Sequence, residues 1–88
     1  MTDEQLLLEI KTRLSITGTH HDNLLLSYAN DVKDYMLSAG VDNEIVQSKK
    51  SLGAIARGVA DLWTGDGTFS ELFKQRVIQL TFEVAESV

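Results

Sequence analysis

The chain has 88 residues with no proline and no cysteine, and its 13 acidic against 8 basic side chains give a formal net charge of −5. A chain of this length forms one domain around one hydrophobic core, so residues 1–88 are predicted to be a single domain. The composition excludes disulfides and thiolate metal sites. The acidic balance, which is concentrated in residues 1–48, disfavours autonomous DNA binding, because that binding depends on Lys and Arg at the phosphates.

The sequence predicts a small all-α domain of four helices, over residues 3–14, 22–39, 48–63 and 70–86. Apolar residues recur at intervals of three and four, and none of them alternate over the length of a strand. Thr2 and Gln5 form a capping-box pattern before the first helix. Asp22 is placed to cap the second helix, and Gly40 to end it. The predicted core faces of these two helices comprise Leu7, Ile10, Leu14, Leu25, Tyr28, Ala29, Val32, Tyr35, Met36 and Ala39.

The segment between Gly40 and Ser48 has two interpretations. Asp42 could cap one long helix that continues into the next predicted helix. Alternatively, Ile45 and Val46 could form a short turn that packs on the core before a new helix begins at Ser48. The second interpretation is preferred.

The third predicted helix organises the rest of the chain. It carries one apolar stripe, and small residues, among them Gly53 and Gly58, occupy its other faces. Because a mid-helix glycine costs roughly 1 kcal/mol relative to alanine, we expect another backbone to pack closely against these faces. Trp63 is expected to be the largest single contributor to the core. The apolar stripe consists of Leu52, Ile55, Ala56, Val59, Leu62 and Trp63.

A glycine-rich turn is predicted to join the third and last helices into a helical hairpin. Gly65 and Gly67 allow a positive φ and a sharp change of direction. Thr68 or Ser70 is placed to cap the last helix, and Thr68 with Glu71 fits a capping box. The apolar stripe of the last helix, with Leu72 beside it, comprises Phe69, Phe73, Val77, Leu80 and Val84.

No pattern in the sequence predicts an enzyme, a cofactor site, a metal site or a membrane span. The motifs of serine hydrolases, zinc proteases and nucleotide-binding loops are absent, and the longest apolar runs have three residues. His20 and His21 are adjacent, and neighbouring residues rarely point at one ion, so they are interpreted as loop residues. Asp61, Asp66 and Glu71 lack the ligand spacing of a calcium loop, which favours roles in turns and caps.

Two weaker patterns concern nucleic acid and charge. Residues 54–60 loosely resemble the corner of a helix-turn-helix motif, although the apolar stripe continues through Gly58. A small helix-turn-helix DNA-binding regulator is therefore the alternative function. Scattered basic residues usually form a solvated face, but in an oligomer they could pair with acidic residues of the next copy. The basic residues concerned are Lys49, Lys50, Arg57, Lys74 and Arg76.

A family resemblance is carried by residues 55–80, which read IARGVADLWTGDGTFSELFKQRVIQL. This run resembles the signature of the small head-tail connector proteins of long-tailed bacteriophages, also called head-completion or DNA-packaging proteins. In that family a helix ending in a GV-x-DLW segment leads through a glycine-rich turn to an F-K-Q-R-V-x-Q-L helix. The similarity extends more weakly over the whole chain. The matching structural residues are Gly58, Asp61, Trp63, Gly65, Gly67 and Phe73.

The resemblance implies an α-helical virion subunit that assembles in the host cytoplasm as a ring, typically of twelve copies, beneath the portal of the DNA-filled head. The ring would join the portal to stopper or tail-completion proteins, and the genome would pass through its channel without sequence-specific binding. Subunits of this type can be monomeric in isolation. The candidate interface residues are Arg57, Asp61, Lys74 and Arg76. Asp61 and Arg76 are expected to set the hairpin geometry or to pair between subunits.

Overall fold

The computed structural model describes residues 1–65 and 68–83, and every regular element within those ranges is helical. The elements in chain order are α1 (Asp3–Leu14), α2 (Asp22–Ser38), α3 (Asn43–Val46), the 3-10 helix η1 (Lys49–Ser51), α4 (Leu52–Thr64) and α5 (Glu71–Thr81). The predicted all-α class is confirmed. The helix count differs from the prediction, because α3 is a separate element between the second and third predicted helices.

α5 ends earlier than predicted. Its last residue is Thr81, whereas the sequence predicted a helix to residue 86. Leu80 is the last buried residue of the described part of the chain, and Phe82 after it is exposed. No described apolar side chain beyond Leu80 is buried against the core, so core packing does not favour a longer helix there. The predicted core residue Val84 lies outside the described residues.

Side-chain hydrogen bonds fix the beginning of α1 and the loop before α2. The predicted capping box is confirmed: the Gln5 N–H donates to Thr2 Oγ1 (3.1 Å) and the Thr2 N–H donates to Gln5 Oε1 (2.9 Å). The prediction that Asp22 caps α2 is wrong, because the helix begins at Asp22 itself. Asp22 instead forms an ion pair with Lys11. Lys11 Nζ also donates to the Gly18 carbonyl (2.6 Å), which ties the loop to α1.

Two short helices connect α2 to α4, and each begins at a side-chain cap. At α3, the Glu44 N–H donates to Asp42 Oδ1 (2.8 Å). At η1, the Lys50 N–H donates to Ser48 Oγ (3.2 Å). The short packed segment and the new start at Ser48 agree with the preferred interpretation, but the new start is η1, and α4 itself begins only at Leu52. Both apolar residues of α3 are buried, so the connection contributes to the core.

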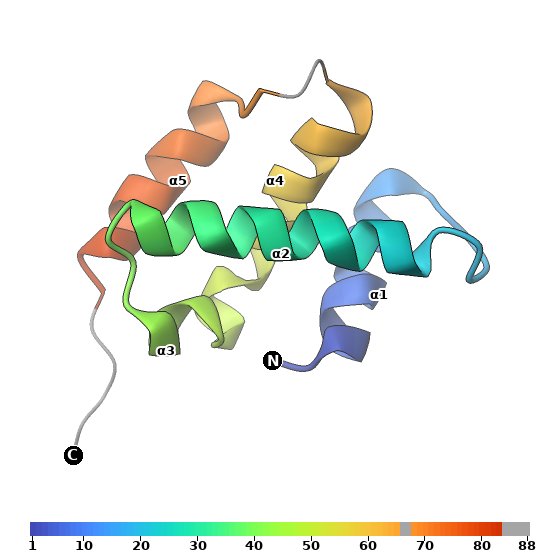
Figure 1. The fold of residues 1–88 in the computed structure, drawn as a ribbon, viewed down its shortest axis with the longest axis horizontal. Helices are drawn as coiled ribbons and strands as arrows, with labels where there is room; N and C mark the ends of the chain where they lie inside the picture. The colour runs from blue at the N-terminus through green and yellow to red at the C-terminus, as the bar shows by residue number, and fades with distance from the viewer. Residues whose placement is uncertain (66–67, 84–88) are drawn as a thin grey trace.

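α4 lies at the centre of the domain, where it contacts α1, α2 and α5. Figure 1 shows α2 crossing in front of α4, with α1 and α5 on either side. Because helices pack around so much of α4, even its small residues Ala54 and Gly58 are buried. The buried apolar residues are Leu6, Ile10, Leu25, Ala29, Val32, Met36, Val41, Ile45, Val46, Ala54, Ile55, Ala56, Val59, Phe73, Val77 and Leu80.

The glycines of α4 accommodate side chains rather than the neighbouring backbone that the sequence predicted. A Cβ atom at Gly58 would lie 2.8 Å from Val32 Cγ1 of α2 and 2.8 Å from Phe73 Cε1 of α5. A Cβ atom at Gly53 would lie 3.4 Å from Arg13 Nη2 of α1. Gly58 therefore lets two helices close on α4, and Gly53 makes room for a guanidinium.

The structure does not place Trp63, the residue predicted to contribute most to the core, among the fully buried side chains. The Trp63 ring is only partly buried, and it packs edge-on against His21 with a centroid distance of 5.0 Å. It lies in the last turn of α4, next to an exposed helix end. Phe73 is instead the largest fully buried side chain, with ring centroids 5.7 Å from Tyr35 and 4.6 Å from Phe69.

The turn after α4 begins without the predicted positive φ. Gly65 has a φ of −95°, which other residues also adopt. Its lack of a side chain matters for another reason, because a Cβ atom there would lie 2.5 Å from the Asp61 carbonyl oxygen. The second predicted turn glycine, Gly67, and its neighbour Asp66 lie outside the described residues.

Candidate interaction surface

Asp61 joins the end of α4 to the start of α5. Its Oδ2 atom accepts hydrogen bonds from the Ser70 N–H (3.0 Å) and from the Ser70 hydroxyl (2.9 Å). The same hydroxyl oxygen accepts from the Phe73 N–H (3.2 Å), which makes Ser70 the N-cap of α5. We call Asp61, Ser70 and Phe73 the junction clamp. The predicted capping box of Thr68 with Glu71 is wrong, because α5 already begins at Glu71.

Replacing Ser70 with alanine is expected to lower the free energy of unfolding by about 1–2 kcal/mol, because it removes an N-cap and a hydrogen bond to a carboxylate. Urea unfolding followed by far-UV circular dichroism measures the change. Thr64→Ala is a matched control, since the Thr64 hydroxyl donates to the Ala60 carbonyl within α4 (2.8 Å). The control should change the free energy by no more than about 0.5 kcal/mol. Equal losses in the two variants would contradict the clamp.

Three arginines from three helices line one surface hollow of about 350 Å³. We call this hollow the arginine groove. The small side chains of α4 leave room there for the long cationic side chains that α1 and α5 contribute. The lining residues are Arg13, Gly53, Ala54, Arg57, Leu72 and Arg76.

The arginine groove and α2 lie on different sides of α4. Gly58 faces α2 and the first turn of α5, since Val32 and Phe73 are both within contact distance of a Cβ atom placed there. With about 100° of rotation per helical residue, Arg57 lies about 100° and Gly53 about 140° around the helix from Gly58. Figure 1 agrees, because α2 crosses in front of α4 while α1 and α5, which supply the other walls of the groove, flank it.

The groove is cationic although the chain is acidic. Arg13 Nε donates to Glu9 Oε2 (2.9 Å), and Arg57 Nε lies 3.6 Å from Asp61 Oδ1, beyond hydrogen-bond distance. Arg76 forms no ion pair with any residue that the structure describes. A guanidinium carries five N–H donors in a planar fork. The groove therefore keeps most of its donors available for carboxylates or phosphates, which accept bidentate hydrogen bonds from arginine.

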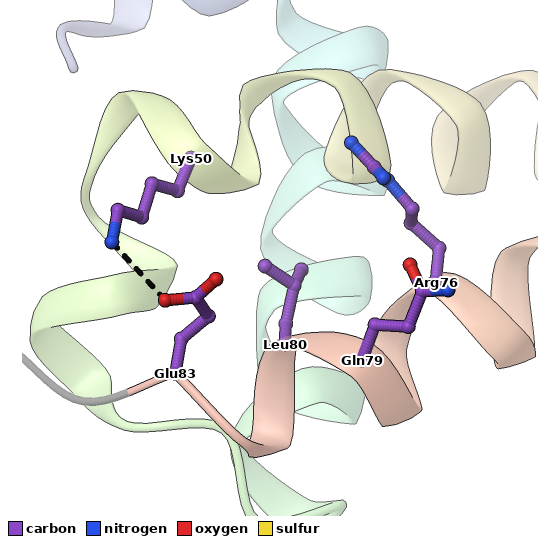
Figure 2. Close-up of a pocket in the computed structure, with 5 residues that line it drawn as sticks. All are labelled: Lys50, Arg76, Gln79, Leu80 and Glu83. Carbon is purple, nitrogen blue, oxygen red and sulfur yellow. Dashed lines mark hydrogen bonds and ion pairs between the residues drawn. The ribbon is translucent and has the colours of Figure 1, made fainter.

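A second hollow, of about 310 Å³, adjoins the groove along α5 and shares Arg76 with it. Figure 2 shows Arg76 and Gln79 on one side of this hollow, Leu80 in the middle, and the paired Lys50 and Glu83 on the other side. Lys50 Nζ lies 3.1 Å from Glu83 Oε2. Arg76 thus borders both hollows, while the other cation of the second hollow is already paired.

The structure brings two of the four predicted interface residues together. Arg57 and Arg76 both line the groove, and Asp61 lies beside it through its contact with Arg57. Lys74 is separate, because two residues of helix place it about 200° around α5 from Arg76. Its ammonium lies 3.8 Å from Glu71, an exposed pair that contributes little to stability.

Sequence reasoning missed Arg13 as a groove residue. Arg13 is far from the α4 and α5 segments in sequence, and only the packing of α1 on α4 brings it to Gly53. The available signal is the small residue Gly53 on α4, which by itself predicts close approach without identifying Arg13 as the neighbour. Leu72 was placed beside the predicted core stripe, but it is 61 % exposed at the edge of the groove.

The outer side of α5 also exposes large apolar side chains. Besides Leu72, Ile78 is 57 % and Phe82 is 82 % exposed, and these two residues are four positions apart on the flank opposite the groove. Single exposed hydrophobic residues are common on protein surfaces. Leu72, Ile78 and Phe82 are close together in sequence, however, so both flanks of α5 expose apolar surface that a partner could cover.

Comparison of this chain with models of protein families, with curated proteins and with solved structures finds no match. Among the described residues, no group of three or more His, Asp or Glu side chains could hold a metal ion. His20 and His21 pack edge-on against each other, with a centroid distance of 4.8 Å. No helix in residues 1–65 and 68–83 is long and apolar enough to cross a bilayer.

Proposed function

We propose that this protein is a structural virion subunit, a head-tail connector that assembles as a ring beneath the portal and joins the DNA-filled head to the stopper or tail proteins. The observation that carries the proposal is the surface formed by α4 and α5. There a groove with unused guanidinium donors has the exposed Leu72 at its edge, and the opposite flank of α5 exposes Ile78 and Phe82. A surface of this kind suits contacts with other proteins.

Two residues that carry the family resemblance position the helices that bear this surface. Gly58 lets α2 and α5 close on α4, and Asp61 holds the start of α5 through Ser70. In the proposed subunit these residues give a helical hairpin its geometry, and Arg57 and Arg76 make contacts with other subunits. The net charge of −5 suits a ring whose channel the genome crosses without binding, because acidic surfaces repel the phosphate backbone.

Purified portal protein is expected to recruit the wild-type chain as a ring, measured by size-exclusion chromatography with light scattering and by electron microscopy. Arg76→Glu should weaken recruitment, because it reverses a charge that has no partner within the described part of the subunit. Lys74→Glu makes the same change of charge on the other flank of α5, and a smaller loss of recruitment in that variant would place the contact on the groove flank. Failure of portal to recruit the wild-type chain would contradict the proposal.

The alternative, a helix-turn-helix DNA-binding regulator, loses the motif on which it depended. α4 runs without interruption from Leu52 to Thr64, so there is no corner at Gly58. We expect no shift of duplex DNA in a gel at low salt. A salt-dependent shift that Arg57→Ala abolishes would favour the regulator instead.

A further inference from the structure

We propose that the arginine groove binds the outer face of α2 from a second copy of this chain, so that copies associate head to tail. The proposal rests on the ring assembly proposed above, and it names the two surfaces that make the contact. The groove supplies guanidinium donors, and the α2 face supplies carboxylate acceptors.

The outer face of α2 carries an acidic stripe, which we define as Ser27, Asp31 and Asp34 with Leu24 and Leu37 at its edges. Both aspartates are exposed, and their spacing of three residues makes them neighbours on the helix surface. Neither aspartate pairs with a basic side chain in the described part of the molecule. Leu24 is 44 % and Leu37 is 40 % exposed.

The two surfaces are complementary in both charge and apolar content. Carboxylates accept paired hydrogen bonds from the planar guanidinium fork, so Asp31 and Asp34 suit the unused donors of Arg57 and Arg76. Leu72 stands at the edge of the groove as the leucines stand at the edges of the stripe. Apolar contact beside the charge pairs would exclude water and strengthen those pairs.

Because of where the two surfaces lie, each copy can bind one neighbour through its groove and another through its stripe. The groove and α2 lie on different sides of α4, so one copy cannot satisfy its own groove with its own stripe. Each bound copy then leaves one groove and one stripe free, which is a heterologous contact that closes into a ring when the rotation per copy allows it.

A second copy fits the groove better than a polyphosphate does. The net charge of −5 repels a nucleic acid backbone and a second copy alike, so the preference between them depends on the local match. An incoming α2 presents just two carboxylates with flanking leucines, which is a local match to a local cationic groove.

Sedimentation of the isolated wild-type chain should show self-association at low salt that weakens as salt is added, because the Debye length falls from about 30 Å at 0.01 M to about 8 Å at 0.15 M. Arg76→Glu and the double variant Asp31→Lys, Asp34→Lys should each weaken self-association at least about tenfold. An equimolar mixture of these two variants should form a discrete heterodimer. One variant retains the stripe and the other retains the groove, so one wild-type contact remains between them.

Two controls place charge reversals away from both surfaces: Lys74→Glu matches Arg76→Glu, and Glu44→Lys reproduces one of the two reversals in the stripe variant. Lys74→Glu lies on the opposite flank of α5 from the groove, and Glu44→Lys is exposed on α3. Both should associate like the wild-type chain at matched ionic strength. Circular dichroism of every variant establishes that its helices are intact.

Three results would overturn the inference. The first is a wild-type chain that stays monomeric at millimolar concentration in low salt. If that monomer binds a poly-glutamate peptide, the groove belongs to another acidic protein and not to a second copy. The second is self-association that the groove and stripe variants do not change. The third is a variant mixture that forms no heterodimer. None of these results decides portal recruitment, so the contact can fail while the proposed adaptor function stands.

Discussion

Replacing Phe73 with alanine is expected to lower the free energy of unfolding by about 3–5 kcal/mol, the largest loss for any single side chain in this domain. Phe73 is fully buried, and its ring packs against Tyr35 and Phe69 as well as against the α4 backbone at Gly58. A domain of this size has a total stability of only about 5–10 kcal/mol. Urea unfolding of the variant should therefore show a large drop in the transition midpoint.

Trp63→Ala is the comparison that distinguishes this core from the one predicted from the sequence. Trp63 is larger than Phe73 but only partly buried, so its replacement should cost about 1–2 kcal/mol. Phe73→Leu provides a second comparison, because it keeps an apolar side chain in the core and should lose less than Phe73→Ala. A larger loss for Trp63→Ala than for Phe73→Ala would contradict the packing described here.

Gly58→Ala is expected to destabilise the domain by about 1–3 kcal/mol, although alanine is the better helix former by about 1 kcal/mol. The new methyl group would lie 2.8 Å from both Val32 and Phe73, closer than carbon atoms approach in a packed core. α2 or α5 must then move away from α4. Thermal unfolding by circular dichroism measures the loss.

Gly53→Ala is the matched control for this prediction. It makes the same chemical change in the same helix, but the nearest atom, at 3.4 Å, belongs to the flexible Arg13 side chain. Its effect should range from neutral to a gain of about 1 kcal/mol. The double variant Val32→Ala, Gly58→Ala should lose less stability than the sum of the two single variants, because the smaller side chain at position 32 makes room for the new methyl group. Identical effects at the two glycines would show that Gly58 is not a point of close packing.

Helix type and most core positions could be predicted from the sequence, because they depend on local spacing. The Thr2 and Gln5 capping box and the fresh start at Ser48 are read from short patterns, and both are present in the structure. Asp22 shows the limit of such patterns. An aspartate at the start of a predicted helix suits an N-cap, but the Asp22 carboxylate forms an ion pair with Lys11 instead of capping α2.

Features that depend on distant contacts could not be predicted. The periodicity of α4 assigns Trp63 to the apolar stripe, but burial also requires neighbouring elements that extend to the helix end. The two glycines of α4 indicate close approach without identifying what approaches. The arginine groove needs the position of α1 relative to α4 and α5, and no pattern within one segment encodes that position.

The position of Arg13 in the arginine groove also makes completion of the groove a late step in folding. α4 and α5 are neighbours in sequence and close a short loop, whereas α1 reaches α4 only after closing a loop that contains all of α2 and α3. Longer loops cost more entropy to close and slow the contacts that depend on them. The third guanidinium is therefore expected to arrive with the docking of α1, so that a partly folded chain presents an incomplete arginine groove.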